Sequence, residues 1–452
     1  MLDISGRRIA IVRIKASVVK LFTVMVSLLA CAASQQTLSN LDRGRALDML
    51  KAISNDVKKH YYDPKMHGVD FDARVAEAKA KIEKATSFNM AMSHIAAALD
   101  TLNDSHTFFT PPMHSYRFDY GIQYQIIGNR CFVTHVRPKS DAEAKGLKPG
   151  DEILTFNTYD INRDDIEKIQ YVFSTLRPQP SLQLLLRDPA GTERPVEVQA
   201  QIIQGKQLRD LTDANGYVDG YDLYRQAETH EHLTRIRYIE CGDPLIVIKL
   251  PEFKYLAASD VEGLVGKANK HRAVILDLRG NRGGLVQTLK FMIGGFFDKE
   301  VKIADRVGRK ETKPETSKPL PHPFNGKLVV LVDAESASAA ELFARLVQLE
   351  KRGVVMGDKT MGAVMEAVHY DEQTGADTSI YYGASITDAD LIMSDGKSLE
   401  HVGVTPDEVL LPSAQALAAG QDPVLAHAAE TLGVKLSPED AGKAFPYEWA
   451  PI

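Results

Sequence analysis

The chain has 452 residues, of which 44% are hydrophobic and 25% charged, as is usual for a globular protein long enough to form two or three domains. Its formal net charge is −6, and no basic tract follows the N-terminal region, which argues against a nucleic-acid-binding protein. Three cysteines are too few for the disulfide framework of a small secreted domain.

Residues 1–31 have the pattern of a secretory signal peptide. Basic residues precede the apolar run LFTVMVSLLA, and small residues follow it. This run is too short to cross a bilayer, so we expect an exported protein, either periplasmic or extracellular. Two processing routes remain open. "LLAC" resembles the lipobox of bacterial lipoproteins, which would make Cys31 a lipid anchor and the one contact with a membrane, whereas Ala30-Cys31-Ala32 also suits ordinary cleavage.

Residues 32–114 are predicted to form a helical N-terminal domain. Apolar residues recur at spacings of three and four in RALDMLKAISNDVKKHYYDP, in FDARVAEAKAKIEKA and in MAMSHIAAALDTL. The prolines at the end of LNDSHTFFTPP close this helical region.

The pattern changes in residues 115–202, where YGIQYQIIGNRCFVTHV alternates as strands do. The short Ala-rich helix, Gly-Leu-x-Pro-Gly-Asp turn and strand of SDAEAKGLKPGDEILTFN resemble the PDZ domain. The resemblance implies that Tyr120, Gly121, Ile122 and Gln123 form a carboxylate-binding loop whose amides capture a peptide C-terminus. The alternative is that KPGDEI is an ordinary tight turn.

Residues 203–243 are polar and irregular and are interpreted as an insertion or linker. In residues 244–452 the apolar runs LIVIKL, AVILDL, KLVVLV and RGVVMG alternate with helical segments, which is typical of a mostly parallel sheet covered on both faces. The predicted fold class is therefore a multidomain α/β protein with an N-terminal helical segment, a PDZ-like β domain and an α/β core.

The segment LVVLVDAESASAAELFARLVQLE passes from an apolar strand into a periodic helix, with Ser336 and Ser338 among alanines at the junction. One interpretation is helix capping. The other is a nucleophile at a helix N-terminus, where backbone amides and the helix dipole favour a developing anion. A second stretch, AVILDLRGNRGG, fits neither the GxGxxG fingerprint nor the P-loop, but its glycine turn can offer free amides to a ligand. Within it, Asp277 and Arg279 are interpreted as a structural ion pair.

Together with SLEHVGVTPDEVL, and in this order after a PDZ-like segment, these stretches resemble the tail-specific (C-terminal processing) protease family and its relative, the tricorn core protease. The resemblance covers nearly the whole chain after the signal region, including YYDP and LNDSHTFFTPP. It implies a crotonase/ClpP-like core of ββα units with Ser338 as the nucleophile. It also implies an oxyanion hole formed by the amides of Ala339 and of Gly283 or Gly284.

The catalytic base departs from the better-known branch of that family. Tail-specific proteases carry a lysine in F-G-K-G downstream of the serine, whereas this chain reads KTMGAVME and has Ala363 at the lysine position. Lys359 comes earlier, where the family often carries a non-catalytic lysine. A Ser-Lys dyad is therefore not expected.

A histidine stands where the lysine branch tends to have phenylalanine, because the family pattern D-P-F-T-R-F matches Asp-Ser-His-Thr-Phe-Phe here. The tricorn core has an adjacent Ser-His pair at this place and a glutamate in E-N-x-G-V-x-P-D, which EHVGVTPD fits apart from His401. The resemblance implies His106 as the base, oriented by Glu400 through Ser105. A lone histidine before aromatic residues is usually structural, but its coincidence with the missing lysine favours catalysis.

The sequence thus predicts a serine endopeptidase that hydrolyses protein or peptide substrates and engages their C-termini through its PDZ domain. We expect no cofactor and no metal, since neither HExxH nor any other ligand spacing occurs. Two alternatives remain open: a catalytically silent scaffold that binds peptides, and a hydrolase of non-peptide acyl compounds, because a core fold does not determine the chemistry.

Overall fold

The computed structural model describes residues 38–114, 116–204, 220–375 and 380–452. The predicted signal peptide, with Cys31, lies outside these ranges. No helix within them combines the length and the apolar character that a membrane span requires. The described chain is mixed α/β and contains several separate sheets.

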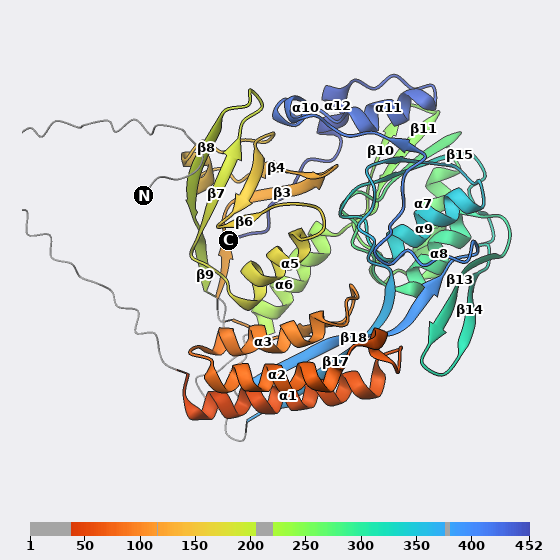
Figure 1. Ribbon diagram of the computed structural model, residues 1–452. Coiled ribbons are helices and arrows are strands. Elements are labelled where there is room, and N and C mark those ends of the chain that lie inside the picture. Colours follow the sequence, from red (N-terminus) through yellow and green to blue (C-terminus); the bar gives the residue numbers. More distant parts are fainter. Residues whose placement is uncertain (1–37, 115, 205–219, 376–379) are drawn as a thin grey trace, which may run out of the picture. The chain divides into compact units, whose positions relative to one another are not determined.

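Three helices open the described chain: α1 (Asn40–His60), α2 (Phe71–Lys84) and α3 (Phe88–Asp100). Each begins after a polar cap, Ser39, Asp70 or Ser87, whose side chain accepts a backbone N–H of the first turn. Their apolar faces pack against a long hairpin of β17 (Met365–Thr374) and β18 (Ile380–Ile392) (Figure 1). The predicted N-terminal helical segment therefore shares its core with a hairpin from the far end of the chain.

The hairpin belongs to a sheet that joins distant parts of the chain. Strand β1 (Phe108–Thr110) pairs antiparallel with β18, which also pairs with β13 (Val301–Gly308), and β13 pairs with β14 (Thr312–Ser317). Phe108 is opposite Ser385 in this register. The short helical turn Met66–Gly68 lies between α1 and α2.

The segment predicted to be PDZ-like forms a sheet of its own, in the order β3-β4-β5-β7-β8, with β6 beside β5. Its helices α4, α5 and η2 follow β4 and β6, and a separate pair of strands, β2 and β9, brackets the sheet in sequence. The core of this segment is a hydrophobic cluster that includes Ile126, Val133 and Leu184. The bounds are β2 Tyr116–Asp119, β3 Ile122–Ile127, β4 Arg130–Val136, α4 Asp141–Ala144, β5 Glu152–Phe156, β6 Tyr159–Asp160, α5 Ile166–Tyr171, η2 Val172–Leu176, β7 Ser181–Arg187, β8 Glu193–Gln199 and β9 Gln201–Gln204.

The remaining sheet has the order β10-β11-β12-β15-β16-β19, and every pair except the antiparallel β10–β11 is parallel. This agrees with the mostly parallel sheet predicted from the near-continuous apolar runs. The strands are β10 Arg237–Cys241, β11 Leu245–Lys249, β12 Ala273–Asp277, β15 Lys327–Val332, β16 Val354–Gly357 and β19 Glu408–Val409.

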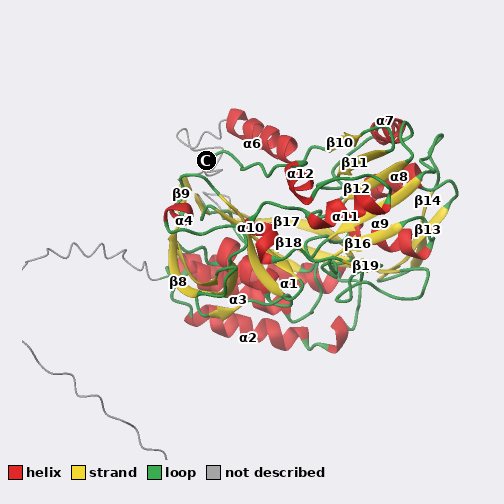
Figure 2. Ribbon diagram, turned by 90° about the horizontal axis from the view of Figure 1, so that it is seen from above, coloured by secondary structure: helices red, strands yellow, loops and turns green. Residues whose placement is uncertain are grey.

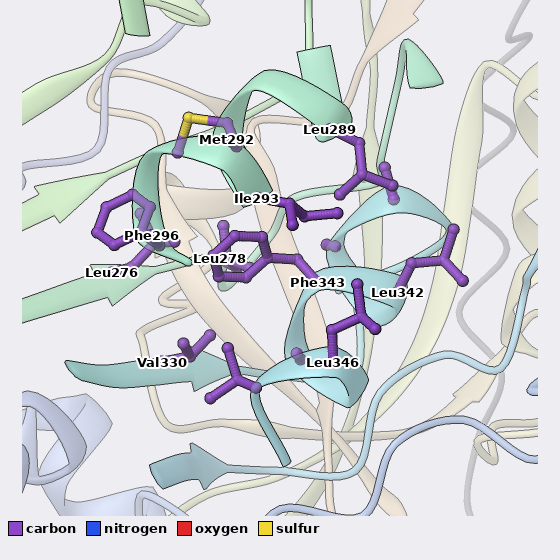
Figure 3. Packing of buried hydrophobic residues seen from close by; sticks show 14 of the residues in the cluster. Leu276, Leu278, Leu289, Met292, Ile293, Phe296, Val330, Leu342, Phe343 and Leu346 are labelled. Atoms are coloured by element: carbon purple, nitrogen blue, oxygen red, sulfur yellow. The ribbon is translucent and has the colours of Figure 1, made fainter. Parts of the chain in front are cut away.

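Alternate side chains of this sheet enter two different cores. Leu276 and Val330 share a hydrophobic cluster with α7 (Ala258–Ala268), α8 (Val286–Phe296) and α9 (Ala339–Leu349), whereas Ile275 and Val329 share one with α11 (Pro423–Thr431) and α12 (Pro438–Lys443). These helices and the strands of the sheet can be followed in Figure 2. Figure 3 shows how α8 and α9 interlock over the first face through residues such as Met292, Ile293, Phe296, Leu342 and Phe343. Two further helices lie in the described chain, α6 (Gly220–Leu233) and α10 (Ala414–Ala418).

We predict that Phe343→Ala lowers the free energy of unfolding by about 3–5 kcal/mol, because it leaves a cavity in a rigid core. The Phe343 ring is fully buried and meets Phe296 and Phe297 edge to face, at centroid distances of 6.0 and 6.4 Å. Urea unfolding followed by circular dichroism measures the change. Met113→Ala is the control, since that side chain is 83% exposed. Equal unfolding midpoints for the two variants would contradict the assignment of this core.

Candidate active site

Ser338 occupies the turn between β15 and α9. Its backbone lies at φ 54° and ψ −118°, a conformation that costs a non-glycine residue free energy and that clusters at functional sites. Gly283 faces it so closely that a Cβ there would come within 2.7 Å of the Ser338 Cβ. The turn is therefore sharp, strained and dependent on a glycine opposite.

The hydroxyl of Ser338 does not cap helix α9. The Glu341 carboxylate accepts the Ser338 N–H at 3.0 Å, and the Ser338 side chain makes no capping bond, so its hydroxyl is left for other use. Ser336 differs, because its buried Oγ donates to the Leu278 carbonyl at 2.9 Å and accepts the Asp333 N–H at 3.0 Å. Of the two serines, Ser336 has a packing role.

Two of the three amides predicted to form an oxyanion hole are available. Within the described ranges, the backbone N–H groups of Gly284 and Ala339 have no hydrogen-bond acceptor. The Gly283 N–H instead donates to Asn281 Oδ1 at 2.8 Å. Of the two predicted alternatives, Gly284 is the glycine whose amide has no acceptor, whereas Gly283 has no side chain and so lets Ser338 approach.

Asn281 is a site residue that the sequence reasoning missed. Its side chain is completely buried and, besides accepting from Gly283, donates to the Leu250 carbonyl at 2.8 Å. It thereby braces the glycine turn against β11. The available signal was its position inside RGNRGG, where a polar side chain beside a tight turn can bond to the turn's own backbone.

Ser105, His106 and Glu400 form a continuous chain of hydrogen bonds. The Ser105 Oγ lies 2.7 Å from His106 Nδ1 and donates to Glu400 Oε2 at 2.9 Å. The Ser105 N–H donates to Glu400 Oε1 at 2.7 Å, and the Val364 N–H donates to Oε2 at 2.8 Å. The carboxylate is thus held by three donors, and its orientation is transmitted to the imidazole through one hydroxyl.

Burial lowers the pKa of His106 below its ordinary value, although the charges of Glu400 and Asp104 act in the opposite direction. The imidazole is therefore predominantly neutral at pH 7. Asp104, whose role the sequence reasoning did not identify, shapes the local turn, because its Oδ1 accepts the N–H groups of His106 and Thr107 at 3.0 and 2.7 Å. It also accepts the Thr387 hydroxyl of β18 at 2.7 Å.

The position of the missing lysine lies directly beside Ser338. The Ser338 N–H donates to the Ala363 carbonyl at 2.8 Å, so residue 363 is a backbone neighbour of the serine but has only a methyl side chain. Lys359 is exposed, and in the part of the chain that the structure describes its ammonium group forms no hydrogen bond or ion pair. Neither residue supplies a base at Ser338.

Glu341 lies beneath the serine turn and is completely buried. Its pKa is raised to about 7, because the effect of burial outweighs that of the hydrogen bonds from Thr360, Gly362, Ala363 and Ser338, which lower it. The sequence motifs assigned no role to Glu341.

The predicted ion pair of Asp277 and Arg279 beneath the glycine turn is part of a network that includes a further carboxylate. Arg279 contacts Asp277 at 2.9 Å and also Asp422, at the start of α11, at 2.7 Å. Burial alone would raise the pKa of Asp277, but the charges of Arg279 and Lys249 hold it well below its ordinary value. The network fixes where the glycine turn leaves β12.

Two hydrogen-bonding groups of the predicted carboxylate-binding loop are already bonded to neighbouring residues. The Gly121 N–H donates to Asp119 Oδ1 at 2.7 Å, and the Tyr120 hydroxyl donates to the Gln179 carbonyl at 2.6 Å. Ile122 is buried in the domain core, and Gln123 is exposed on β3. The Gly121 amide is therefore not free for a ligand in this structure.

The same domain is bonded to the loops around Ser338. Arg282, in the glycine turn, makes a bidentate ion pair with Glu167 of α5 at 2.9 and 3.0 Å. Gln125 of β3 donates to Asp333 in the serine loop, and Ala334 packs into the domain's hydrophobic cluster. Among the described residues, no group of three or more His, Cys, Asp or Glu side chains is arranged to hold a metal ion.

Sequence comparison supplies the wider context. The model of the family described as "Peptidase family S41" matches residues 245–410. The chain is 26% identical over 279 residues to the carboxyl-terminal-processing protease of Picosynechococcus sp., covering 60% of this chain and 59% of that protein. It is 24% identical over 315 residues to the tail-specific protease of Haemophilus influenzae, covering 64% and 42% respectively. The chain thus matches about half of the length of these relatives.

Solved structures resemble the fold at low sequence identity. Mature CPAF complexed with lactacystin aligns with a TM-score of 0.62 and 16% identity, covering 84% of this chain and 96% of that one. The photosystem II D1 C-terminal processing protease aligns with a TM-score of 0.50 and 16% identity, covering 82% and 97%. The family predicted from the motifs agrees with these findings: residues 245–410 match the model of peptidase family S41, and the relatives are named as C-terminal processing or tail-specific proteases.

Proposed function

We propose that this chain is an exported serine endopeptidase in which Ser338 is the nucleophile, His106 the general base, and Ser105 with Glu400 the groups that orient the base. The main observation in support of the proposal is the continuous chain of hydrogen bonds from Glu400 through Ser105 to His106 Nδ1. A second observation is the strained backbone of Ser338, whose hydroxyl is not used for capping. The alanine at position 363 removes the competing lysine.

The hydrogen-bond directions assign the tautomer of His106. Ser105 has one hydroxyl proton, and it donates that proton to Glu400. Its oxygen must therefore accept from Nδ1–H of His106, which leaves the Nε2 lone pair free. Nε2 takes the proton from the Ser338 hydroxyl as Oγ attacks the peptide carbonyl, and then returns it to the leaving amine. Water repeats the sequence to release the acyl group.

The oxyanion of the tetrahedral intermediate is assigned to the amides of Gly284 and Ala339. Both N–H groups lack an acceptor in the described structure. Ala339 directly follows Ser338, and Gly284 follows Gly283, which lies against the Ser338 side chain. Removing one such donor typically costs about 10²- to 10³-fold in rate. The N-terminus of α9 adds a favourable dipole at the same place.

The substrate class is proposed to be proteins or peptides cleaved near their C-termini, as the names of the relatives indicate for those proteins. The domain of residues 115–202 is proposed to engage the substrate C-terminus as a PDZ domain would. Export rests on the signal-peptide pattern of residues 1–31, and anchoring through Cys31 remains one of its two processing routes.

A fluorophosphonate serine probe tests the nucleophile and the base. Ser338→Ala should abolish labelling of the purified protein, because the probe bonds to the activated serine oxygen. His106→Ala should slow labelling by about 10²- to 10⁴-fold, the usual contribution of a general base. Lys359→Ala should label as the wild type does. If Lys359→Ala also lost labelling, the base would be wrongly assigned. An unreactive wild type would contradict the proposed activity.

The rate of peptide cleavage should fall as the pH is lowered through a pKa below 6.5. His106 acts as a base only when it is neutral, and its burial lowers the pKa, so the neutral form persists to lower pH than for an ordinary histidine. The measurement is the pH dependence of kcat/KM, with circular dichroism at each pH to confirm the fold. Glu341, whose pKa is raised to about 7, can also contribute to an acidic limb, so the profile is measured in Glu341→Gln as well. An acidic limb that stays centred well above 6.5 in that variant would contradict this environment for His106.

Ser105→Ala should lower kcat by about 10-fold or more while leaving KM nearly unchanged, because it breaks the connection that orients the imidazole. Glu400→Gln removes the charge but keeps the size, and it should act in the same direction. Serine 413, which caps α10 away from this chain of bonds, provides the control Ser413→Ala. Wild-type kcat in both Ser105→Ala and Glu400→Gln would rule out this arrangement.

A further inference from the structure

Glu341 is a buried carboxylate without a basic partner among the described residues, a costly arrangement unless hydrogen bonds compensate. Four donors point at it. Its Oε1 accepts the Thr360 hydroxyl at 2.5 Å and the Gly362 N–H at 2.8 Å. Its Oε2 accepts the N–H groups of Ala363 and Ser338, both at 3.0 Å. Only the ionised carboxylate can accept all four bonds, because a protonated oxygen would face a donor.

These donors come from two segments that meet at the nucleophile. Ser338 belongs to the turn before α9, whereas Thr360, Gly362 and Ala363 belong to the loop after β16. The same Ser338 N–H is shared between Glu341 Oε2, at 3.0 Å, and the Ala363 carbonyl, at 2.8 Å, so the loop is also bonded directly to the turn. Glu341 therefore locks the nucleophile's backbone to this loop from below.

The same loop holds the segment that carries Glu400. The Val364 N–H donates to Glu400 Oε2 at 2.8 Å, and the His401 N–H donates to the Gly362 carbonyl at 2.7 Å. The Thr360 hydroxyl, while donating to Glu341, accepts the Val404 N–H at 2.6 Å. One buried carboxylate thus fixes the loop through which Ser338 and Glu400 are placed relative to each other.

We propose that Glu341 is a positioning residue for catalysis, which holds the Ser338 turn in register with the Glu400–Ser105–His106 chain by fixing the loop of residues 360–364. The inference rests on the proposed function and deepens it. Glu341 does not touch the reacting atoms, so its contribution lies in alignment, where a misplacement of about 1 Å can cost on the order of 10²-fold in rate.

The test compares Glu341→Gln with the wild type at pH 8, where the carboxylate is ionised. The fluorophosphonate reaction is resolved into kinact and KI, and the folded fraction is measured by circular dichroism. The amide keeps the shape but replaces one acceptor oxygen by a donor that faces two donors. We expect kinact per folded molecule to fall about 10- to 10²-fold with KI unchanged. The matched control is Glu152→Gln, a buried glutamate of β5 that pairs with Arg130 and Arg187 and should leave kinact at the wild-type value.

Thr360→Val provides a second, independent variant. It removes the hydroxyl that links Glu341 to Val404 while leaving the carboxylate in place. Its effect on kinact should be in the same direction, and the double variant should fall short of the sum of the two effects, since both act on one network. If Glu341→Gln does not fold, the kinact of Thr360→Val alone tests the positioning role: a fall supports the role, and a wild-type value contradicts it.

The outcomes separate this inference from the proposed function. A folded Glu341→Gln with wild-type kinact, or with a raised KI and unchanged kinact, would overturn the positioning role while leaving the proposed activity intact. Fully additive effects of Glu341→Gln and Thr360→Val would also overturn it. A wild type that does not react with the probe would overturn the proposed function first, and the role of Glu341 with it.

Discussion

The parallel register of β12, β15 and β16 is the constraint on which the site depends. Asp277 is opposite Leu331, and Val332 is opposite Gly357, so the three strands end side by side. The glycine turn, the serine turn and the loop of residues 360–364 therefore begin at one edge of the sheet, where parallel α/β proteins usually place their ligands. Backbone hydrogen bonds between these segments, such as Ala337 N–H to the Asn281 carbonyl at 2.9 Å, then turn three neighbouring loops into one surface.

The antiparallel sheet positions the other candidate residues of the site, Ser105, His106 and Glu400. Strand β1 starts two residues after His106 and pairs with β18, and the Thr107 hydroxyl bonds to Thr387 on both its donor and acceptor sides. The chain that leaves β18 reaches Glu400 a few residues later. A single strand pairing thus brings Ser105 to a carboxylate that is 295 residues away in sequence. The helices α1 to α3 stabilise this arrangement because they share a hydrophobic core with the hairpin.

The two glutamates near the serine turn have different proposed roles. Consecutive amides of the same loop, at Ala363 and Val364, point to opposite sides and donate to Glu341 and Glu400 respectively. Glu341 is compensated entirely by hydrogen-bond donors and secures geometry. In the proposed mechanism Glu400 orients the His106 imidazole through the Ser105 hydroxyl, and burial lowers the pKa of that imidazole. In the same mechanism Ala363 offers no amine beside Ser338, and His106 takes the role of base that the lysine has in the better-known branch.

Local sequence was sufficient to predict most secondary-structure elements, and the motifs indicated a serine peptidase. The apolar runs predicted the parallel strands, and the small residues around Ser338 fitted a strand-to-helix junction. The candidates for a base and its orienting groups, His106, Ser105 and Glu400, came from the resemblance to the tail-specific and tricorn proteases. Sequence could not say which atoms meet, because residues in separate segments are brought together only by strand pairing. Tertiary structure alone decided that Gly284 rather than Gly283 has a free amide, that Asn281 and Asp104 brace their turns, that the helical N-terminal segment shares a core with β17 and β18, and that Glu341 joins the loops. Each of these depends on hydrogen bonds between segments far apart in the chain, for which spacing along the sequence carries no signal.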